Sequence, residues 1–298
     1  MPELPEVEVV RLGLAPVVAG ARVESVEVFD TRSLKRHRGP AEDFRHRLEG
    51  ARLEMPLRRG KFLWIPLRAN DQALVCHLGM SGQVLLGDES SDFGSHLRIR
   101  LDLVSAEGKP CVVGFVDQRI FGSMAIDDLV SVEGPGGWGS GDPRIPRAVS
   151  HIARDPLDEA FDLDAVSARV RGKNTEIKRA LLDQGVISGI GNIYADEALW
   201  ATQLHYRYPT NRLSKKTFAL LIQNVKDVLV KALGEGGTSF DQQYVNVNGK
   251  SGYFSHSLMA YGQQGLPCPR CASILVREPW MNRSSHRCPR CQRVPRFR

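Results

Sequence analysis

The sequence predicts an α+β protein with two main domains and a small metal-binding element near its carboxyl end. Three observations support this fold class. Strand-like segments fill the first part of the chain, helical periodicity follows a stretch rich in glycine and proline, and two Cys-x-x-Cys pairs come last. With 298 residues, 42% of them apolar, the chain is long enough to bury more than one hydrophobic core.

The chain begins with a predicted helix. Pro5 suits the first helical position, Glu6 and Glu8 suit the first turn, and Val7 and Val10 begin an apolar face that Leu14 continues. The same residues allow a chemical interpretation. If Met1 is removed, which we expect before a small second residue, Pro2 carries a free secondary amine beside the Glu3 carboxylate. Such an amine is partly neutral at physiological pH and therefore nucleophilic.

The segments after this helix are strand-like, with β-branched residues and, in one of them, strict alternation of apolar and charged residues. We expect strands at Arg22–Phe29, Lys61–Leu67, Ala73–Leu78, Leu97–Leu103 and Pro110–Val116. Repeated short strands of this kind indicate a β-sandwich or a flattened barrel, which we assign to residues 1–133.

Residues 134–146 contain many glycines and prolines without periodicity, which is typical of a linker, and we place the linker at 134–150. Helical periodicity then predicts helices at Leu163–Arg171, Thr175–Asp183, Asn192–Gln203 and Ser214–Leu233. The last helix has an apolar face, a possible N-cap at Ser214 and a stop at Gly234. These helices define a domain at 151–262.

A short turn with two glycines separates two of these helices. Gly189 and Gly191 precede Asn192, and Lys178 lies one helix earlier. Backbone N–H groups at such a helix start can bind a phosphate. The pattern has too few glycines and no preceding strand, which argues against a dinucleotide-binding fingerprint and favours a helix-turn-helix-like contact with DNA.

Four cysteines near the end predict a structural zinc site in a small domain at 263–298. The two Cys-Pro-Arg-Cys pairs, separated by sixteen residues, supply Cys268, Cys271, Cys288 and Cys291. Two disulfides are the alternative, but no secretory signal indicates an oxidising compartment. No stretch approaches a membrane span, so we expect a soluble protein. Cys76 and Cys111 lie in apolar segments and are expected to be buried thiols.

The charge distribution indicates a nucleic acid partner. The chain has a net charge of +6, and residues 268–298 contain eight arginines but a single acid, Glu278. Part of this excess fits a solvated basic tail. Arg283 fits that explanation less well, because it lies within the cysteine loop beside Asn282 and two serines, side chains that also bind phosphate.

Six motifs together resemble bacterial formamidopyrimidine-DNA glycosylases, a helix-two-turn-helix family of 8-oxoguanine glycosylases and abasic-site lyases. They are residues 2–8 (Pro-Glu-Leu-Pro-Glu-Val-Glu), 59–62 (Arg-Gly-Lys-Phe), 77–82 (His-Leu-Gly-Met-Ser-Gly), 117–122 (Asp-Gln-Arg-Ile-Phe-Gly), 189–194 (Gly-Ile-Gly-Asn-Ile-Tyr) and the four cysteines. The resemblance covers nearly the whole chain and implies a β-sandwich with a leading helix, a helix-two-turn-helix domain and a zinc-finger β-hairpin.

The resemblance implies a role for each catalytic residue. Pro2 attacks C1′ of the damaged nucleotide, Glu3 protonates the sugar ring oxygen and then shuttles protons during elimination, and Glu6 organises the pocket. Lys61 and Arg283 join the catalytic set and contact phosphates near the lesion. Without the resemblance, Lys61 would be read as a solvated lysine at the end of a strand.

The resemblance also implies a set of DNA contacts. Met80, Arg119 and Phe121 fill the space that the flipped base leaves, although core packing is the alternative for the two apolar residues. Further contacts with DNA are expected from His77, Lys178, Asn192 and Tyr253. Residues 236–252 form a plausible lid over the base, or else an ordinary surface loop.

The chain departs from the family pattern at two positions of one loop. Gln118 and Ile120 replace the proline and second arginine of many members, which alters loop stiffness and one possible phosphate contact. Opposite-base preference is therefore left open.

The resulting hypothesis is a monomeric bifunctional enzyme of the bacterial cytoplasm, associated with the nucleoid. It would bind damaged duplex DNA between its two domains, with one structural Zn²⁺, no organic cofactor and no membrane contact. Two alternatives remain. The endonuclease VIII branch prefers oxidised pyrimidines, and Leu4 and the Met80/Arg119/Phe121 set disfavour it. A non-catalytic DNA-binding relative would be expected to lose Pro2 or Glu3.

Overall fold

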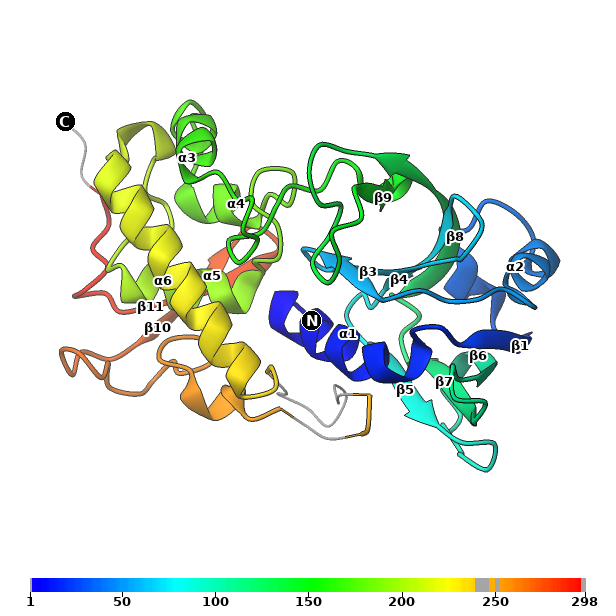
Figure 1. The fold of residues 1–298 in the computed structure, drawn as a ribbon. Helices are drawn as coiled ribbons and strands as arrows, with labels where there is room; N and C mark the ends of the chain where they lie inside the picture. Colours follow the sequence, from blue (N-terminus) through cyan, green and yellow to red (C-terminus); the bar gives the residue numbers. More distant parts are fainter. Residues whose placement is uncertain (1, 239–246, 250–251, 296–298) are drawn as a thin grey trace. The chain divides into compact units, whose positions relative to one another are not determined.

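A computed structural model describes residues 2–238, 247–249 and 252–295. The chain forms two compact units (Figure 1). Unit 1 contains residues 1–151 and 235–253, and unit 2 contains residues 152–234 and 254–298. The expected α+β class, with a β-sandwich, a helical region and a terminal hairpin, is confirmed. Among the described residues, no helix is both long and apolar enough to cross a membrane.

Unit 1 opens with helix α1 (Leu4–Val18), as predicted. Glu3 is its N-cap, and a capping box links Glu3 with Glu6: each side chain accepts a hydrogen bond from the other residue's backbone N–H. Val7, Val10 and Leu14 are buried in the core of the unit. Because the helix start satisfies its own backbone donors with these two carboxylates, their position is determined by the fold of the first turn.

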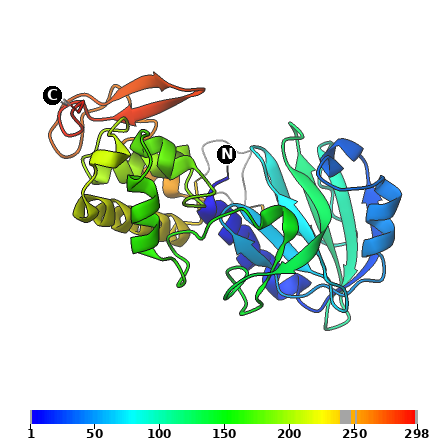
Figure 2. The same cartoon turned by 90° about the horizontal axis from the view of Figure 1, so that it is seen from above.

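Two antiparallel sheets form the β-sandwich of unit 1 (Figure 2). One sheet has the order β1 (Arg22–Val28), β6 (Leu97–Val104), β7 (Pro110–Asp117) and β5 (Gly82–Gly87). The other has the order β2 (Leu57–Arg59), β3 (Phe62–Pro66), β4 (Gln72–His77), β8 (Ser123–Ser131) and β9 (Arg144–Pro146). The short helix α2 (Ala41–Leu48) contacts β1 and β8. Apolar residues of both sheets and of α1 form one core.

The predicted strands are confirmed to within a few residues, but α2 and several strands had no clear signal in the sequence. In β8 two adjacent aspartates, Asp127 and Asp128, interrupt the apolar alternation. The expected linker is corrected as well: residues 144–146 form β9 on the edge of the sheet, and Trp138 exchanges backbone hydrogen bonds with Arg58. Sheet pairing therefore orders a stretch whose composition suggests a flexible connection.

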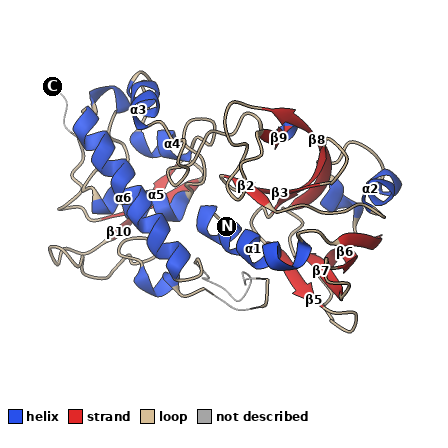
Figure 3. Ribbon diagram, in the orientation of Figure 1, coloured by secondary structure: helices blue, strands red, loops and turns tan. Residues whose placement is uncertain are grey.

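Unit 2 contains the four predicted helices, α3 (Leu163–Arg171), α4 (Ile177–Leu182), α5 (Asn192–Ala201) and α6 (Lys215–Gly234), followed by the hairpin β10 (Val276–Trp280) and β11 (Arg283–Arg287) (Figure 3). The predicted apolar face of α6 is buried. Helix α5 contacts α6, and it also contacts β11. The hairpin is therefore part of the same compact unit as the helices.

The structural units differ from the expected domain boundaries of 151–262 and 263–298. The cysteine-containing hairpin groups with the helices, and residues 235–253 group with the sandwich. One reason is visible at Val247, which is buried in the sandwich core and accepts a hydrogen bond from the backbone N–H of Leu86. Chain order alone does not reveal such a return to the first unit.

Candidate functional site

The start of α1 places two carboxylates in a buried setting next to Pro2. Pro2 is buried, and the exposed fractions of Glu3 and Glu6 are 1% and 2%. Glu6 accepts a hydrogen bond from the backbone N–H of Glu3 at 2.7 Å and another from the backbone N–H of Thr238 at 2.7 Å. Glu6 thus fixes the backbone that carries Glu3 and Pro2.

A buried ion-pair cluster joins α1 to the hairpin formed by β2 and β3. Glu8 accepts hydrogen bonds from Arg58 Nε at 2.8 Å and from Arg11 Nη2 at 2.7 Å. Arg58 also donates to the carbonyl of Gly60 at 3.1 Å. Gly60, with a φ of 56°, and Lys61 form the two-residue turn of this hairpin. The cluster therefore anchors the turn that carries Lys61 to the helix that carries Glu3.

His77 lies at the end of β4 in a positively charged environment. Its ring packs on Phe62 with centroids 4.7 Å apart, and its Nδ1 accepts a hydrogen bond from the backbone N–H of Gly79 at 3.2 Å. Burial, followed by the charges of Arg36, Lys61 and Lys35, lowers the pKa of His77 to about 4. The ring is consequently neutral near pH 7, and the Nδ1 contact assigns its proton to Nε2, which can donate to an anion.

Asp117 brings two loops of unit 1 together. This fully buried carboxylate accepts hydrogen bonds from the Ser81 hydroxyl and from the backbone N–H groups of Arg119, Ile120 and Gly122. Gly79 has a φ of 64° and approaches Phe121 so closely that a Cβ at this position would lie 2.4 Å from the Phe121 carbonyl carbon. The loop with Met80 is therefore pressed against the loop with Phe121.

The three residues expected to replace the flipped base lie on these two loops. Met80 and Phe121 are 42% and 40% exposed, which is unusual for large apolar residues and does not fit the alternative of core packing. The Arg119 guanidinium lies 4.5 Å from the centroid of the Phe121 ring. Ile120 has a φ of 55°, a strained value for a β-branched residue, and its carbonyl accepts a hydrogen bond from Lys35 Nζ at 2.8 Å.

One further expected contact of unit 1, Tyr253, directly follows the expected lid in the sequence. Tyr253 is 73% exposed, and its backbone N–H donates to the carbonyl of Glu235. Most of the expected lid, namely residues 239–246 and 250–251, lies outside the described residues, so its function stays a prediction.

In unit 2 the turn between α4 and α5 is fastened by one side chain. Gln184 donates to the carbonyls of Leu182 and Ile190 and accepts from the backbone N–H of Gly189, at distances of 2.9 to 3.1 Å. Gly191 is the N-cap of α5, and Asn192 begins this helix. The Asn192 amide donates to the carbonyl of Ser284 at 3.1 Å. The expected phosphate-binding turn is therefore rigid, and it contacts the hairpin directly.

Lys178, expected to contact DNA, is instead enclosed by the protein. Its side chain is fully buried, and its Nζ donates to Asp196 at 2.6 Å, to the Ser285 hydroxyl at 2.7 Å and to the Ser284 carbonyl at 3.1 Å. An ammonium enclosed in this way has no free surface for a phosphate. Lys178 instead holds β11 on α4 and α5, and this correction depends on tertiary contacts that sequence spacing does not show.

Asp196 completes this attachment of the hairpin. Its second carboxylate oxygen accepts a hydrogen bond from the backbone N–H of His286 at 2.9 Å. Arg283, which begins β11 just before these contacts, is exposed, and its Nε donates a hydrogen bond to the neighbouring Asn282 side chain at 3.3 Å. The exposed guanidinium of Arg283 thus stands on a strand that Asp196 and Lys178 fix in place.

The four cysteines near the end form the expected cluster. The Sγ atoms of Cys268, Cys271, Cys288 and Cys291 all lie within 4.8 Å of one another. Four thiolates around a tetrahedral Zn²⁺ with bonds of about 2.3 Å would be separated by about 3.8 Å, so the geometry fits a closed structural site. All six cysteines of the chain are free, which excludes the two-disulfide alternative in this structure.

Three buried acids were not identified as important from the sequence: Glu8, Asp117 and Asp196. Each is nearly inaccessible to solvent and accepts several hydrogen bonds from groups that position an expected site residue. Glu8 and Asp117 are themselves end residues of two of the motifs, and Asp196 lies two residues after a third, which was the available signal. Their partners are distant in sequence or on the backbone, and a single sequence does not indicate such pairs.

Comparisons with known proteins agree with this geometry. Residues 1–124 match the model of the formamidopyrimidine-DNA glycosylase N-terminal domain, and residues 152–243 match the model of the formamidopyrimidine-DNA glycosylase H2TH domain. The formamidopyrimidine-DNA glycosylase of Leifsonia xyli is 57% identical over 99% of this chain and its own full length.

Two solved structures also resemble the chain. A Lactococcus lactis FPG mutant in complex with DNA containing Fapy-dG is 28% identical, with a TM-score of 0.82. A MutM complex with DNA containing carbocyclic 8-oxo-G is 27% identical, with a TM-score of 0.81. In both comparisons the similarity covers 98% of this chain and 100% of the other.

Proposed function

The chain belongs to the formamidopyrimidine-DNA glycosylase family, and we propose that it excises oxidised purines from duplex DNA through an iminium formed at Pro2. After base loss, the same intermediate supports cleavage of the strand by β- and δ-elimination. The protein is thus a DNA glycosylase and abasic-site lyase of base excision repair.

The chemistry follows from the first three residues. Once Met1 is removed, the Pro2 nitrogen attacks C1′, and the base leaves with the electrons of the glycosidic bond while the sugar ring opens. Glu3 gives a proton to the ring oxygen and, as a carboxylate, takes a proton from C2′. The iminium nitrogen accepts the electrons of that C–H bond and thereby drives loss of the 3′ phosphate, and a second elimination releases the 5′ phosphate.

The observation that carries this proposal is the capping box at the start of α1. Glu3 is 1% exposed, and its backbone N–H donates a hydrogen bond to the Glu6 carboxylate. This bond fixes the position of Glu3 next to Pro2. A helix start needs a cap, but a cap does not require two buried carboxylates adjacent to a proline in second place. This arrangement supplies a nucleophile and a proton shuttle at fixed separation.

We assign the exposed loop residues Met80, Arg119 and Phe121 to the space vacated by the flipped base. Their support is their exposure and the buried Asp117 that clamps both loops. Phosphate contacts are assigned to Lys61, His77, Asn192, Tyr253 and Arg283. Lys178 contributes by positioning the hairpin. The relatives that support the substrate class are those solved with Fapy-dG and 8-oxo-G in DNA.

We assign the cysteine cluster to one Zn²⁺. The four thiolate donors suit this ion, and they leave no open position for a substrate. The metal therefore stabilises the hairpin, and the chemistry lies at Pro2. The proposal includes a monomer in the bacterial cytoplasm, in keeping with the bacterial relatives.

The test is an excision assay with matched variants. The protein, verified to lack Met1, is incubated with a duplex carrying 8-oxoguanine opposite cytosine and with one carrying an oxidised pyrimidine. Glu3→Gln removes the proton shuttle, and Glu42→Gln removes an exposed carboxylate of the same unit as a control. We expect preferential cleavage of the first duplex, a loss of at least about a hundredfold in Glu3→Gln and no change in the control.

Two results would contradict the proposal. Preference for the oxidised pyrimidine would support the endonuclease VIII branch instead. Binding without cleavage of either duplex by protein that lacks Met1 would support a non-catalytic DNA-binding role.

A further inference from the structure

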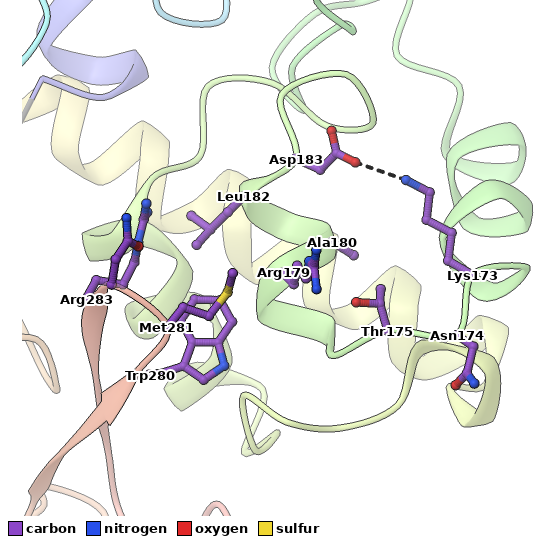
Figure 4. A pocket seen from close by; sticks show the side chains of 11 residues that line it. Lys173, Asn174, Thr175, Arg179, Ala180, Leu182, Asp183, Trp280, Met281 and Arg283 are labelled. Atoms are coloured by element: carbon purple, nitrogen blue, oxygen red, sulfur yellow. Dashed lines mark hydrogen bonds and ion pairs between the residues drawn. The ribbon is translucent and has the colours of Figure 1, made fainter.

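A groove in unit 2 lies between α4 and the turn of the β10–β11 hairpin (Figure 4). Its volume is about 730 Å³, and its walls come from two segments, residues 173–183 and 280–283. Arg283, already assigned to a phosphate, lies at one wall. The rest of the groove has no role in the function proposed above.

The groove is positively charged. Lys173, Arg179 and Arg283 face a single acid, Asp183. That acid is paired with Lys173 at 3.0 Å, as the dashed line in Figure 4 shows. Arg179 is exposed, and its side chain has no hydrogen bond or ion pair with any described part of the chain. After the Lys173 pair is discounted, two arginines remain to bind an anion.

The other walls suit a sugar-phosphate chain better than a free ion. Trp280 is fixed by a hydrogen bond from its indole N–H to Glu176 at 2.5 Å. The adjacent Met281 is 64% exposed and has a φ of 52°, which is strained for a residue other than glycine. Asn174, Thr175 and Asn282 add amide and hydroxyl groups at the rim. The groove therefore offers cations, polar donors and an apolar surface together.

We propose that this groove binds a DNA phosphodiester additional to the one assigned to Arg283, and that Arg179 is the cation that contacts it. This inference rests on the proposed function, because Arg283 shares the groove and defines DNA as its occupant. The exposed side chain of Met281 makes the apolar contact with the deoxyribose next to that phosphate, and the buried Trp280 holds the start of the turn in place. Phosphate contacts of this kind position a protein on DNA and carry no sequence information.

The test compares Arg179→Ala with Lys216→Ala. Lys216 is an exposed cation in the first turn of α6 in the same unit, and it does not line the groove. Binding to a duplex with a non-cleavable abasic-site analogue is measured over a salt series for both variants and the unaltered protein. Metal content and thermal unfolding are measured first, to establish that the exposed substitution leaves the fold intact.

We expect Arg179→Ala to weaken binding roughly threefold to tenfold and to reduce the slope of log K against log salt by about 0.9, the value for one phosphate of B-DNA. Lys216→Ala should leave affinity and slope unchanged. The duplex is then scanned with single neutral methylphosphonates. At one position the substitution should weaken DNA binding by the unaltered protein but not by Arg179→Ala.

The proposal is overturned if Arg179→Ala binds with unchanged slope, or if no methylphosphonate position distinguishes it from the unaltered protein. An equal loss in Lys216→Ala would overturn it too, because the effect would then reflect net charge alone. Covalent trapping at Pro2 is measured on the same variants. If the groove test fails but the unaltered protein still forms the covalent adduct at Pro2, only the groove proposal is wrong. If the unaltered protein forms no adduct, the result counts against the proposed function.

Discussion

In each unit a buried ion pair lies where a β-hairpin packs on a helix, but the two hairpins differ in what else holds them. In unit 1 Arg58 of β2 pairs with Glu8 of α1 at 2.8 Å. In unit 2 Lys178 and Asp196 pair at 2.6 Å and both contact β11. The first hairpin continues into a large apolar core. The second has a core of Cys268, Leu275 and Cys288 with a few partly buried neighbours.

The difference indicates that the two hairpins are stabilised by different forces. The hairpin that carries Lys61 depends mainly on apolar burial, which many residues share. The hairpin that carries Arg283 depends on one buried polar network and, if the cysteine cluster holds Zn²⁺ as proposed, on thiolate–metal bonds. Loss of a single component should therefore affect unit 2 much more than unit 1.

Metal removal should show this difference most strongly. Binding of structural Zn²⁺ contributes on the order of 10 kcal/mol in small zinc domains, far more than the small core of this hairpin can replace. We expect chelation to weaken DNA binding at least about a hundredfold while the sandwich stays folded. Hydrogen exchange of the two units and DNA affinity before and after verified metal loss measure both effects. Tight binding by the metal-free protein would show that the hairpin does not need the metal.

Breaking the ion pairs should have the next largest effect. Lys178→Met leaves the buried carboxylate of Asp196 without its lysine partner, which costs about 3–5 kcal/mol. Arg58→Met removes one of the two arginines that pair with Glu8, and because Arg11 remains, its cost should be smaller. Hydrogen exchange should locate the loss in unit 1 for the first variant and in unit 2 for the second. Only Lys178→Met should release the start of β11. For this variant, DNA binding should weaken more than the loss of folding stability alone would explain. Equal effects of both variants on the hairpin of unit 2 would contradict the comparison.

A substitution at Asp117 should have a smaller effect, limited to the loops that carry Met80 and Phe121. Asp117→Asn keeps the size of the side chain but turns one acceptor into a donor that faces backbone N–H groups. We expect a loss of about 1–3 kcal/mol and faster hydrogen exchange at residues 118–122. Asp92→Asn, an exchange in an exposed loop of the same unit, is the control. Unchanged protection of residues 118–122 would show that Asp117 does not hold them.

The two hairpin turns allow a more subtle comparison. Gly60 supplies the positive φ in unit 1, whereas Met281, with a φ of 52°, supplies it in unit 2. Met281→Gly should stabilise unit 2 by up to about 1 kcal/mol, and Gly60→Ala should destabilise unit 1 by a similar amount. If Met281 contacts deoxyribose as proposed, Met281→Gly should also weaken DNA binding slightly. Thermal unfolding and affinity together separate these outcomes.

The pH response of His77 should be confined to acidic solution. Its pKa in the folded protein is about 4 instead of 6.5, so the unfolded chain binds more protons between these values. Stability contributed by His77 is therefore complete above about pH 6.5 and is lost as the pH falls toward 4. A bound phosphate should raise the pKa of His77, which NMR titration with and without DNA can measure. A pKa unchanged by DNA would argue against a phosphate contact.

Much of the fold was predictable because its signals are local. The apolar face of α6, the alternation in β6 and the spacing of the cysteines each follow from a short periodic pattern, and the structure confirms them. The strand β9 and the return of Val247 to the sandwich depend on pairing partners far away in sequence. Local composition at 134–150 consequently did not reveal the strand at residues 144–146.

The same distinction applies to the candidate site. Pro2, Glu3 and the cysteines are recognisable because the chemistry needs those residue types at fixed spacing. The placement of Lys178 was wrong, since its burial depends on Asp196 and on two serines more than a hundred residues away. The contributions of Asp117 and Glu8 were missed for the same reason. Residues that position others are visible only after the chain is folded.

The central claim, an iminium at Pro2, is tested most directly by trapping the intermediate. The protein is incubated with a duplex carrying 8-oxoguanine opposite cytosine in the presence of borohydride, and peptide mass spectrometry locates the bound sugar. The account predicts a reduced adduct on the nitrogen of Pro2 in protein that lacks Met1. An adduct on a lysine such as Lys61, or no adduct although metal is bound and the strand is cleaved, would contradict it.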